Sequence, residues 1–265
     1  MHTWHWQTWE NLPYLTCSLL ESWHHGFFTQ HFSPRLPDQI VGVLQPSASV
    51  YRVKQVHGNI VLTSSEIEDV VGKSVEGKQE AKSPEADGVM TEQSQQAVWV
   101  CTADCTPVLI ADEKTGQVAA VHAGWRGTAS SIVPKAIARL QAQKSSLENL
   151  RIAMGPAIAG EVYQVSETVA AQVGATVVSS ETANNPEAIL ESLRQLPNPP
   201  ILDDLQPGRV RLDVRRVNAL QLKQLGIAPE QVAIAPYCTY QEPEHFFSYR
   251  RNKLKKVQWS GIVSS

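Results

Sequence analysis

The sequence is poor in cysteine, in long apolar runs and in excess positive charge, and each absence excludes a class of protein. Only four cysteines occur in 265 residues, too few to suggest the disulfide framework of a small secreted domain. No stretch approaches the roughly 18 apolar residues of a membrane span. The chain has a formal net charge of −3 and so lacks the excess of lysine and arginine that is typical of nucleic-acid-binding proteins. We therefore expect reduced thiols, and neither a membrane nor a nucleic acid as partner.

The first 20 residues also lack the features of a secretory signal, because they have no basic n-region and Gln7, Glu10 and Asn11 interrupt their apolar residues. We expect a cytoplasmic protein. Hydrophobic residues make up 42% of the chain, enough to bury one substantial core. Two polar stretches, residues 76–85 and 179–200, are interpreted as surface excursions, since neither resembles a flexible interdomain linker. Residues 1–265 are therefore predicted to form a single domain.

Apolar patterning predicts an alternation of strands and helices. Strands rich in β-forming residues are expected at 97–101, 107–111, 117–122 and 151–154. Helices are expected after the third strand with Thr128 or Ser130 as N-cap, at 166–173, from Pro186 behind an Asn185 cap, and between Asp213 and Gly226. Because the spacing lacks the regular βαβ repeat of a doubly wound fold, an α/β or α+β domain with mixed sheets is favoured.

Three chemically active side chains lie at the ends of predicted strands or between them. His57 closes an apolar segment before Gly58, His122 ends the third strand, and Cys105 lies in a polar interruption between two strands. Two imidazoles and one thiolate suit zinc and leave a fourth position open, as in catalytic zinc sites. The separations of 48 and 17 residues match no short zinc motif, so a structural role for each histidine stays open. The other cysteines, Cys17, Cys101 and Cys238, are expected to be structural.

Two further segments suggest contacts to an anion and to a base. Arg126 directly precedes the predicted helix, so its guanidinium and the N–H groups of the helix start could hold phosphate. The alternative is a structural ion pair with Asp104 or Asp87. Residues 245–251 join aromatic side chains to Arg250 and Arg251, a combination that suits base stacking and phosphate contact. A core phenylalanine pair beside a solvated basic stretch is the competing interpretation.

Seven motifs, in this order, resemble the laccase-domain family, whose members are described as multicopper polyphenol oxidases and as purine nucleoside phosphorylases. They are HGFFT at 25–29, QVHG at 55–58, ADGVMT at 86–91, TADCTP at 102–107, HAGWRG at 122–127, MGPAI at 154–158 and FSYRR at 247–251. The resemblance spans about residues 24–262. It implies layered mixed β-sheets flanked by helices, a fold shared with bacterial toxin-type cysteine hydrolases. It also implies zinc on His57, Cys105 and His122.

The activity that the resemblance implies is phosphorolysis of adenosine, inosine and methylthioadenosine, with additional adenosine deamination. Purine nucleosides and phosphate are the expected partners of a monomer or weak homo-oligomer. Cys105, His122, Asp104 and Arg126 are expected to be catalytic, with Asp104 as the carboxyl candidate that protonates the leaving purine. The expected substrate-binding residues are Gln55, Arg126, Phe247, Ser248 and Arg250. One departure from the family pattern is Gln30, which stands where the opening motif usually has arginine, before His31-Phe32-Ser33 in place of the usual glycines.

Two other activities compete with this hypothesis. A copper polyphenol oxidase is disfavoured because multicopper oxidases use many more histidines than the three beyond residue 31, although a single Cys/His copper site stays open. A hydrolase with Cys105 as nucleophile and His122 as base, acting on an amide of a cell-wall precursor, is chemically competent. A purely structural zinc fits poorly, because structural sites usually fill all four positions with protein ligands.

Overall fold

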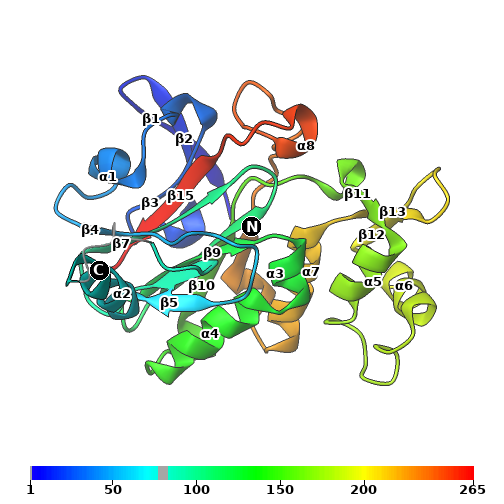
Figure 1. The fold of residues 1–265 in the computed structure, drawn as a ribbon. Coiled ribbons are helices and arrows are strands. Elements are labelled where there is room, and N and C mark those ends of the chain that lie inside the picture. Colours follow the sequence, from blue (N-terminus) through cyan, green and yellow to red (C-terminus); the bar gives the residue numbers. More distant parts are fainter. Residues whose placement is uncertain (1, 77–82) are drawn as a thin grey trace.

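Two six-stranded sheets form the body of the protein (Figure 1). The computed structural model describes residues 2–76 and 83–265, so part of the predicted polar stretch at 76–85 lies outside the described residues. The first sheet has the order β1 (Trp4–Trp9), β2 (Leu12–Cys17), β3 (His25–Phe28), β15 (Gln258–Val263), β7 (Gln96–Thr102) and β4 (Ser49–Tyr51). The second has the order β14 (Val232–Ile234), β10 (Leu150–Met154), β8 (Thr106–Asp112), β9 (Val118–Ala123), β6 (Gly88–Met90) and β5 (Val61–Thr63).

The second sheet is covered on both faces. Apolar side chains of β8 and β9 pack against β7 and β15 of the first sheet on one face. On the other face they pack against α4 (Ile132–Ala142) and α7 (Val214–Gln224). Every residue of β8 and β9 is therefore buried, which explains why their sequences are nearly continuous apolar runs. Both sheets are mixed, since β4–β7, β5–β6 and β10–β14 are parallel pairs. The mixed α/β architecture expected from the sequence is confirmed.

A smaller lobe lies beside the two sheets (Figure 1). It contains a three-stranded sheet of order β11 (Gln164–Ser166), β13 (Arg209–Leu212) and β12 (Ile201–Asp203), with α5 (Glu167–Gly174) and α6 (Pro186–Arg194). The lobe has its own apolar cluster, to which α6 contributes Ile189, Leu190 and Leu193. Part of the polar stretch at 179–200 thus forms an amphipathic helix that covers this cluster.

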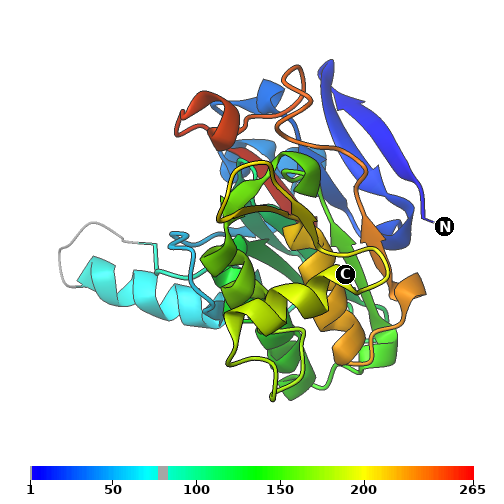
Figure 2. The same cartoon turned by 90° about the vertical axis from the view of Figure 1, so that its right-hand side faces the viewer.

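Four short or peripheral helices complete the chain: α1 (Pro37–Ile40), α2 (Ser64–Glu76), α3 (Trp125–Ala129) and α8 (Tyr249–Asn252). The 3-10 helices are Ser18–Leu20, Gln30–Phe32, Val41–Val43, Leu147–Asn149, Gly160–Val162 and Pro229–Gln231. Figure 2 shows α2 extending away from the sheets at one side of the molecule. Among the described residues, no helix combines the length and the apolar character needed to cross a bilayer.

Local signals in the sequence predicted most of these elements. The four strands expected between residues 97 and 154 are β7, β8, β9 and β10. Asn185 caps α6 by accepting hydrogen bonds from the N–H groups of Glu187 and Ala188, and Asp213 caps α7 by accepting from Arg216. Gly226 then adopts a φ of 92° just after α7, as expected for a glycine stop.

The predicted N-cap after β9 is wrong. The chain already becomes helical at Trp125 in the short α3, and α4 starts after Ser131, which has a left-handed φ of 56° and makes no side-chain cap. Thr128 is unavailable as a cap because it is buried and its hydroxyl accepts a hydrogen bond from Asn218 at 3.1 Å. The break between the two helices turns the chain onto the face of the second sheet.

Candidate metal centre

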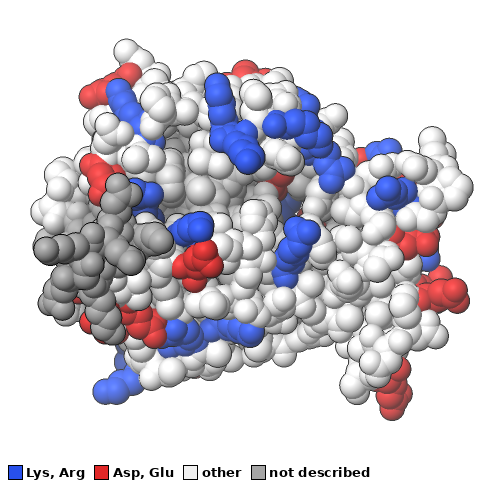
Figure 3. All heavy atoms as spheres, viewed as in Figure 1, with Lys and Arg blue, Asp and Glu red and all other residues white. Residues whose placement is uncertain are grey.

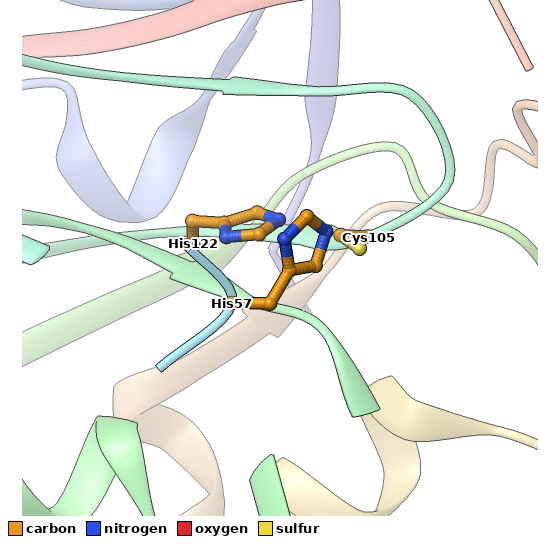
Figure 4. Close-up of side chains that lie close together, drawn as sticks. All are labelled: His57, Cys105 and His122. Atoms are coloured by element: carbon orange, nitrogen blue, oxygen red, sulfur yellow. The ribbon is translucent and has the colours of Figure 1, made fainter. Parts of the chain in front are cut away.

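His57, Cys105 and His122, here called the metal triad, meet in space as the sequence predicts. His57 lies in the loop between β4 and β5, Cys105 in the turn between β7 and β8, and His122 on β9. Their ligand atoms all lie within 4.8 Å of one another, and the close-up shows the three side chains side by side (Figure 4). Two of the three candidate ligands are therefore held at the ends of buried strands, which gives the site a rigid base.

The donor set fits a metal ion. His122 is buried, Cys105 is half-buried and His57 is exposed, so the triad is enclosed by protein at one end and open at the other. Two nitrogen donors and one sulfur donor suit Zn²⁺ and also copper. Backbone space is tight here, since a Cβ atom added to Gly124 would lie 2.8 Å from the Cys105 sulfur. Glycine at this position lets the chain pass the thiol closely.

Asp87 organises both histidines, a role that the sequence did not reveal. Its fully buried carboxylate accepts a hydrogen bond from His122 Nδ1 at 2.8 Å. It also accepts backbone N–H bonds from His57 at 2.8 Å and from Gly58 at 2.6 Å. A proton fixed on Nδ1 leaves His122 Nε2 as the metal-binding atom. Burial opposes ionisation of Asp87, but the hydrogen bonds from His122 and from this loop outweigh it and lower its pKa.

The charges at the triad favour a thiolate on Cys105. Burial opposes its ionisation, but the charge of His122 and hydrogen bonds with His122 and His57 outweigh it and lower the pKa of Cys105 to about 6. Burial also disfavours the charged form of His122, but Cys105 and Asp87 outweigh it and raise the pKa of His122. Thiolate is the form of cysteine that binds metals and acts as a nucleophile. Cys101 differs, because burial raises its pKa to about 11.

Asp104 is next to Cys105 in the chain and is buried. One carboxylate oxygen accepts a hydrogen bond from the Thr239 hydroxyl at 2.8 Å, and the other accepts from the Arg250 backbone N–H at 2.6 Å. The carboxylate therefore ties the start of α8 to the turn that carries Cys105. Ser248 is buried and caps α8 by accepting from the Arg251 N–H at 3.2 Å. A direct part for Asp104 or Ser248 in catalysis or binding stays a prediction.

Two arginines stack on aromatic rings near the triad. The guanidinium carbon of Arg126 lies 4.4 Å from the Trp125 ring centroid, and that of Arg250 lies 4.8 Å from the Tyr163 centroid. Arg126 is the second residue of α3 and does not precede the helix as predicted. Within residues 2–76 and 83–265, neither arginine has an acidic partner. The alternative ion pair of Arg126 with Asp104 or Asp87 is therefore not formed.

The remaining predicted binding residues have structural contacts. The Gln55 side chain bonds both the N–H and the C=O of Cys101, each at 2.8 Å, and so fastens the segment before His57 to β7. Phe247 is half-buried, and its N–H donates to the Gln258 side chain at 2.9 Å. A direct contact of Gln55 or Phe247 with a substrate stays a prediction.

A groove of about 1030 Å³ opens from the triad toward the lobe. His57, Trp125 and Arg126 line one side, and α5 and α6 line the other. Its apolar surface comes from Ala129, Ala171, Ala175, Ile189 and Leu190, and its polar residues include Glu167, Gln172, Asn184 and Glu187. A groove of this size accommodates a small-molecule ligand. Sequence patterns did not indicate it, because its two sides come from segments that meet only in the folded chain.

Comparison with known proteins agrees with the motifs. Residues 38–263 match a family described as multi-copper polyphenol oxidoreductase laccase. A Synechocystis sp. protein named purine nucleoside phosphorylase is 51% identical over 261 residues, which cover 98% of this chain and 97% of that protein. A Corynebacterium glutamicum protein of the same name is 32% identical over 229 residues, covering 86% of this chain and 78% of that one. The crystal structure of YlmD from Geobacillus stearothermophilus shares the fold, with a TM-score of 0.79, 22% identity and 98% coverage of both chains.

Proposed function

The chain belongs to the multi-copper polyphenol oxidoreductase laccase family, and from this premise we propose that it is a zinc-dependent purine nucleoside phosphorylase. The observation that carries the proposal is the convergence of His57, Cys105 and His122, whose ligand atoms lie within 4.8 Å of one another. The name of the 51% identical relative supports the choice of substrates. Adenosine, inosine and methylthioadenosine are the proposed nucleosides, with inorganic phosphate as the second substrate.

The metal triad would hold Zn²⁺, which supplies a Lewis acid with a position left for a substrate. Asp87 keeps His122 in the tautomer that presents Nε2, and the lowered pKa of Cys105 provides a thiolate at neutral pH. Three protein ligands suit a catalytic rather than a structural zinc. Copper would suit the same donors and is part of the family's description, so the metal content of protein purified without added copper decides between the two.

Phosphorolysis requires an anion and a nucleoside to meet at C1′ of the ribose. A phosphate oxygen forms a bond to C1′, the bond from C1′ to the purine nitrogen breaks, and the phosphate proton passes to the departing purine. Arg126 and Arg250 have no acidic partner within the described part of the chain, although Arg250 donates one N–H to the Gln164 carbonyl at 2.8 Å. Phosphate is proposed to bind the remaining N–H groups of one of these two guanidinium groups. We propose Asp104 as the carboxyl group that assists proton transfer. Its bond to the Arg250 N–H also fixes the position of that arginine.

The decisive test is to incubate the purified protein with inosine, with and without phosphate, and to identify ribose 1-phosphate and hypoxanthine. The proposal requires both products, and only when phosphate is present. Cys105→Ser should lose zinc and activity together, whereas Cys101→Ser, which removes the nearby non-ligand thiol, should keep both. Full activity in a metal-free protein contradicts the proposal. Adenosine should in addition give inosine without phosphate, which tests the proposed deaminase activity separately.

A cysteine hydrolase is a second candidate, because Cys105, His122 and Asp87 are arranged as nucleophile, base and orienting carboxylate. The ligand atoms of His122 and Cys105 lie within 4.8 Å of each other, and His122 donates Nδ1–H to Asp87, which is the order that activates a thiol nucleophile. The toxin-type cysteine hydrolase fold implied by the motifs is part of this proposal, and an amide of a cell-wall precursor is the substrate class. Alkylation of Cys105 by iodoacetamide while zinc stays bound favours the hydrolase. Protection of Cys105 by zinc favours the phosphorylase.

A further inference from the structure

Positive charge is concentrated in one short segment of an otherwise slightly acidic chain. Residues 250–256, here called the basic strip, contain Arg250, Arg251, Lys253, Lys255 and Lys256, while the whole chain has a formal charge of −3. The three lysines are exposed. None of the five forms a salt bridge with a described residue. Like charges placed so close together repel one another, and the three exposed lysines have no acidic partner among the described residues to offset this repulsion.

The basic strip begins beside the segment that carries Cys105. The backbone N–H of Arg250 donates to Asp104, the residue before Cys105, at 2.6 Å. Figure 3 shows Lys and Arg side chains gathered over α8, at the rim of a hollow, with a further cationic side chain over α3 on the other side. Arg251 is occupied by the carbonyl groups of Thr239, Tyr240 and Phe246. The lysines are the part of the strip with free ammonium groups, although Lys253 and Lys256 also approach aromatic rings.

The groove on the lobe side has the opposite character. Among its lining residues the only cation is Arg126, whereas Glu167 and Glu187 bring two carboxylates. The rest of the surface includes the Trp125 ring and aliphatic side chains. Such a surface disfavours a dianion and suits a flat, uncharged heterocycle, which can stack on the face of the indole opposite the Arg126 guanidinium. The groove adjoins the triad at His57, while the basic strip starts at Arg250, whose backbone is bonded to Asp104, the residue before Cys105.

We propose that the triad separates two subsites of different charge: inorganic phosphate is recruited over the basic strip, and the purine nucleoside lies in the groove against Trp125. The inference rests on the proposed function and adds where each substrate binds. Displacement at C1′ needs the attacking oxygen and the departing purine nitrogen on opposite faces of the ribose. Subsites on two sides of the triad satisfy this requirement, whereas one shared pocket would place the dianion beside Glu167 and Glu187.

The test compares two triple variants of the zinc-loaded enzyme. K253Q/K255Q/K256Q removes three charges from the basic strip, and K135Q/K144Q/K223Q removes three from exposed lysines elsewhere. The strip variant should raise the KM for phosphate about tenfold at low ionic strength, with the KM for inosine and kcat changed less than about twofold. Added salt should reduce the difference. The distant variant should leave both KM values within about twofold of wild type.

A variant of the groove supplies the reciprocal result. Gln172 is exposed on α5 and lines the groove, so Gln172→Trp adds bulk there without disturbing the core. It should raise the KM for inosine several-fold and leave the KM for phosphate unchanged. Equal effects of the strip variant on both KM values, or no effect beyond that of the distant variant, overturn the inference.

Binding measurements separate this inference from the proposed function. Phosphate binding to zinc-loaded protein is followed by ³¹P NMR line broadening, and inosine binding by tryptophan fluorescence. If wild type shows no phosphorolysis, the proposed function fails by itself. Weaker phosphate binding in the strip variant alone, and weaker inosine binding in Gln172→Trp alone, still support the two subsites. Phosphate binding that is equal in the strip and distant variants overturns them.

Discussion

Replacing Asp87 by Asn should weaken metal binding although Asp87 is not a ligand. One oxygen accepts from His122 Nδ1 and the His57 N–H, and the other accepts from the N–H groups of Val56 and Gly58. An amide can present only one oxygen, so its NH₂ group must face one of these donor pairs. Two hydrogen bonds to a fully buried group are lost, and either the His122 ring or the His57 loop loses its fixed position.

The size of the effect follows from the number of bonds lost. Each hydrogen bond to a charged group contributes about 1.5–3 kcal/mol, so the free energy of unfolding of metal-free Asp87→Asn should fall by about 3–6 kcal/mol. Loss of the carboxylate behind a histidine ligand typically weakens metal affinity about 10–100-fold. Urea unfolding of metal-free protein measures the first quantity, and competition with a chromophoric zinc chelator measures the second.

Asp112 provides the matched control. It is also fully buried and accepts backbone N–H bonds from Lys114 and Thr115, but these lie at the far end of β8 from Cys105. Asp112→Asn should therefore alter stability without changing zinc affinity. The reasoning is refuted if Asp87→Asn binds zinc within about twofold of wild type, or if both variants lose affinity equally.

Three further predictions concern the triad and the fold. Cys105→Ser should reduce zinc content to background and abolish phosphorolysis, while Cys101→Ser retains both, as elemental analysis and product assays will show. Gly124→Ala should weaken zinc binding by at least about tenfold, because its Cβ would lie 2.8 Å from the Cys105 sulfur; unchanged affinity in a chelator titration would falsify this close approach. Burial is the main cause that lowers the pKa of His25 to about 4 from an ordinary 6.5. Between pH 4 and 6.5 the unfolded chain therefore binds a proton at His25 more readily than the folded chain does. The free energy of unfolding should fall by about 3 kcal/mol as pH drops from 6.5 to 4. In His25→Asn, the urea midpoint should fall less over the same pH range than it does in wild type.

The parts of the fold that local sequence determines were predictable. The strand β8 is apolar at nearly every position because both of its faces are covered, and such a run is visible without knowing its neighbours. The caps at Asn185 and Asp213 act within three residues along the chain. The break between α3 and α4 was missed because the apolar spacing after Gly127 indicates a helix but not the left-handed φ of 56° that Ser131 adopts just before α4.

The candidate site likewise has a part that the sequence predicted and a part that it did not. The candidate ligands His57, Cys105 and His122 were proposed from motifs and residue types, and the structure brings their side chains together. Asp87 was considered only as a partner for Arg126, since nothing in the spacing shows that it faces a histidine 35 residues further on. The groove also escaped prediction, because α3 and α5 belong to different parts of the chain. Long-range side-chain pairs and cavities are properties of packing, and one sequence shows them poorly.

The departure from the family pattern at Gln30 becomes understandable in this structure. Its side-chain amide donates to the carbonyl oxygens of Pro243 and Glu244 at 2.6 and 3.1 Å, and its backbone N–H donates to that of His245 at 2.9 Å. Gln30 therefore holds the segment that leads into α8 and the basic strip. A neutral amide serves this purpose without adding another positive charge, because its partners are uncharged carbonyl groups. Gln30 thus supports the phosphate side of the proposed site and lies outside the metal triad.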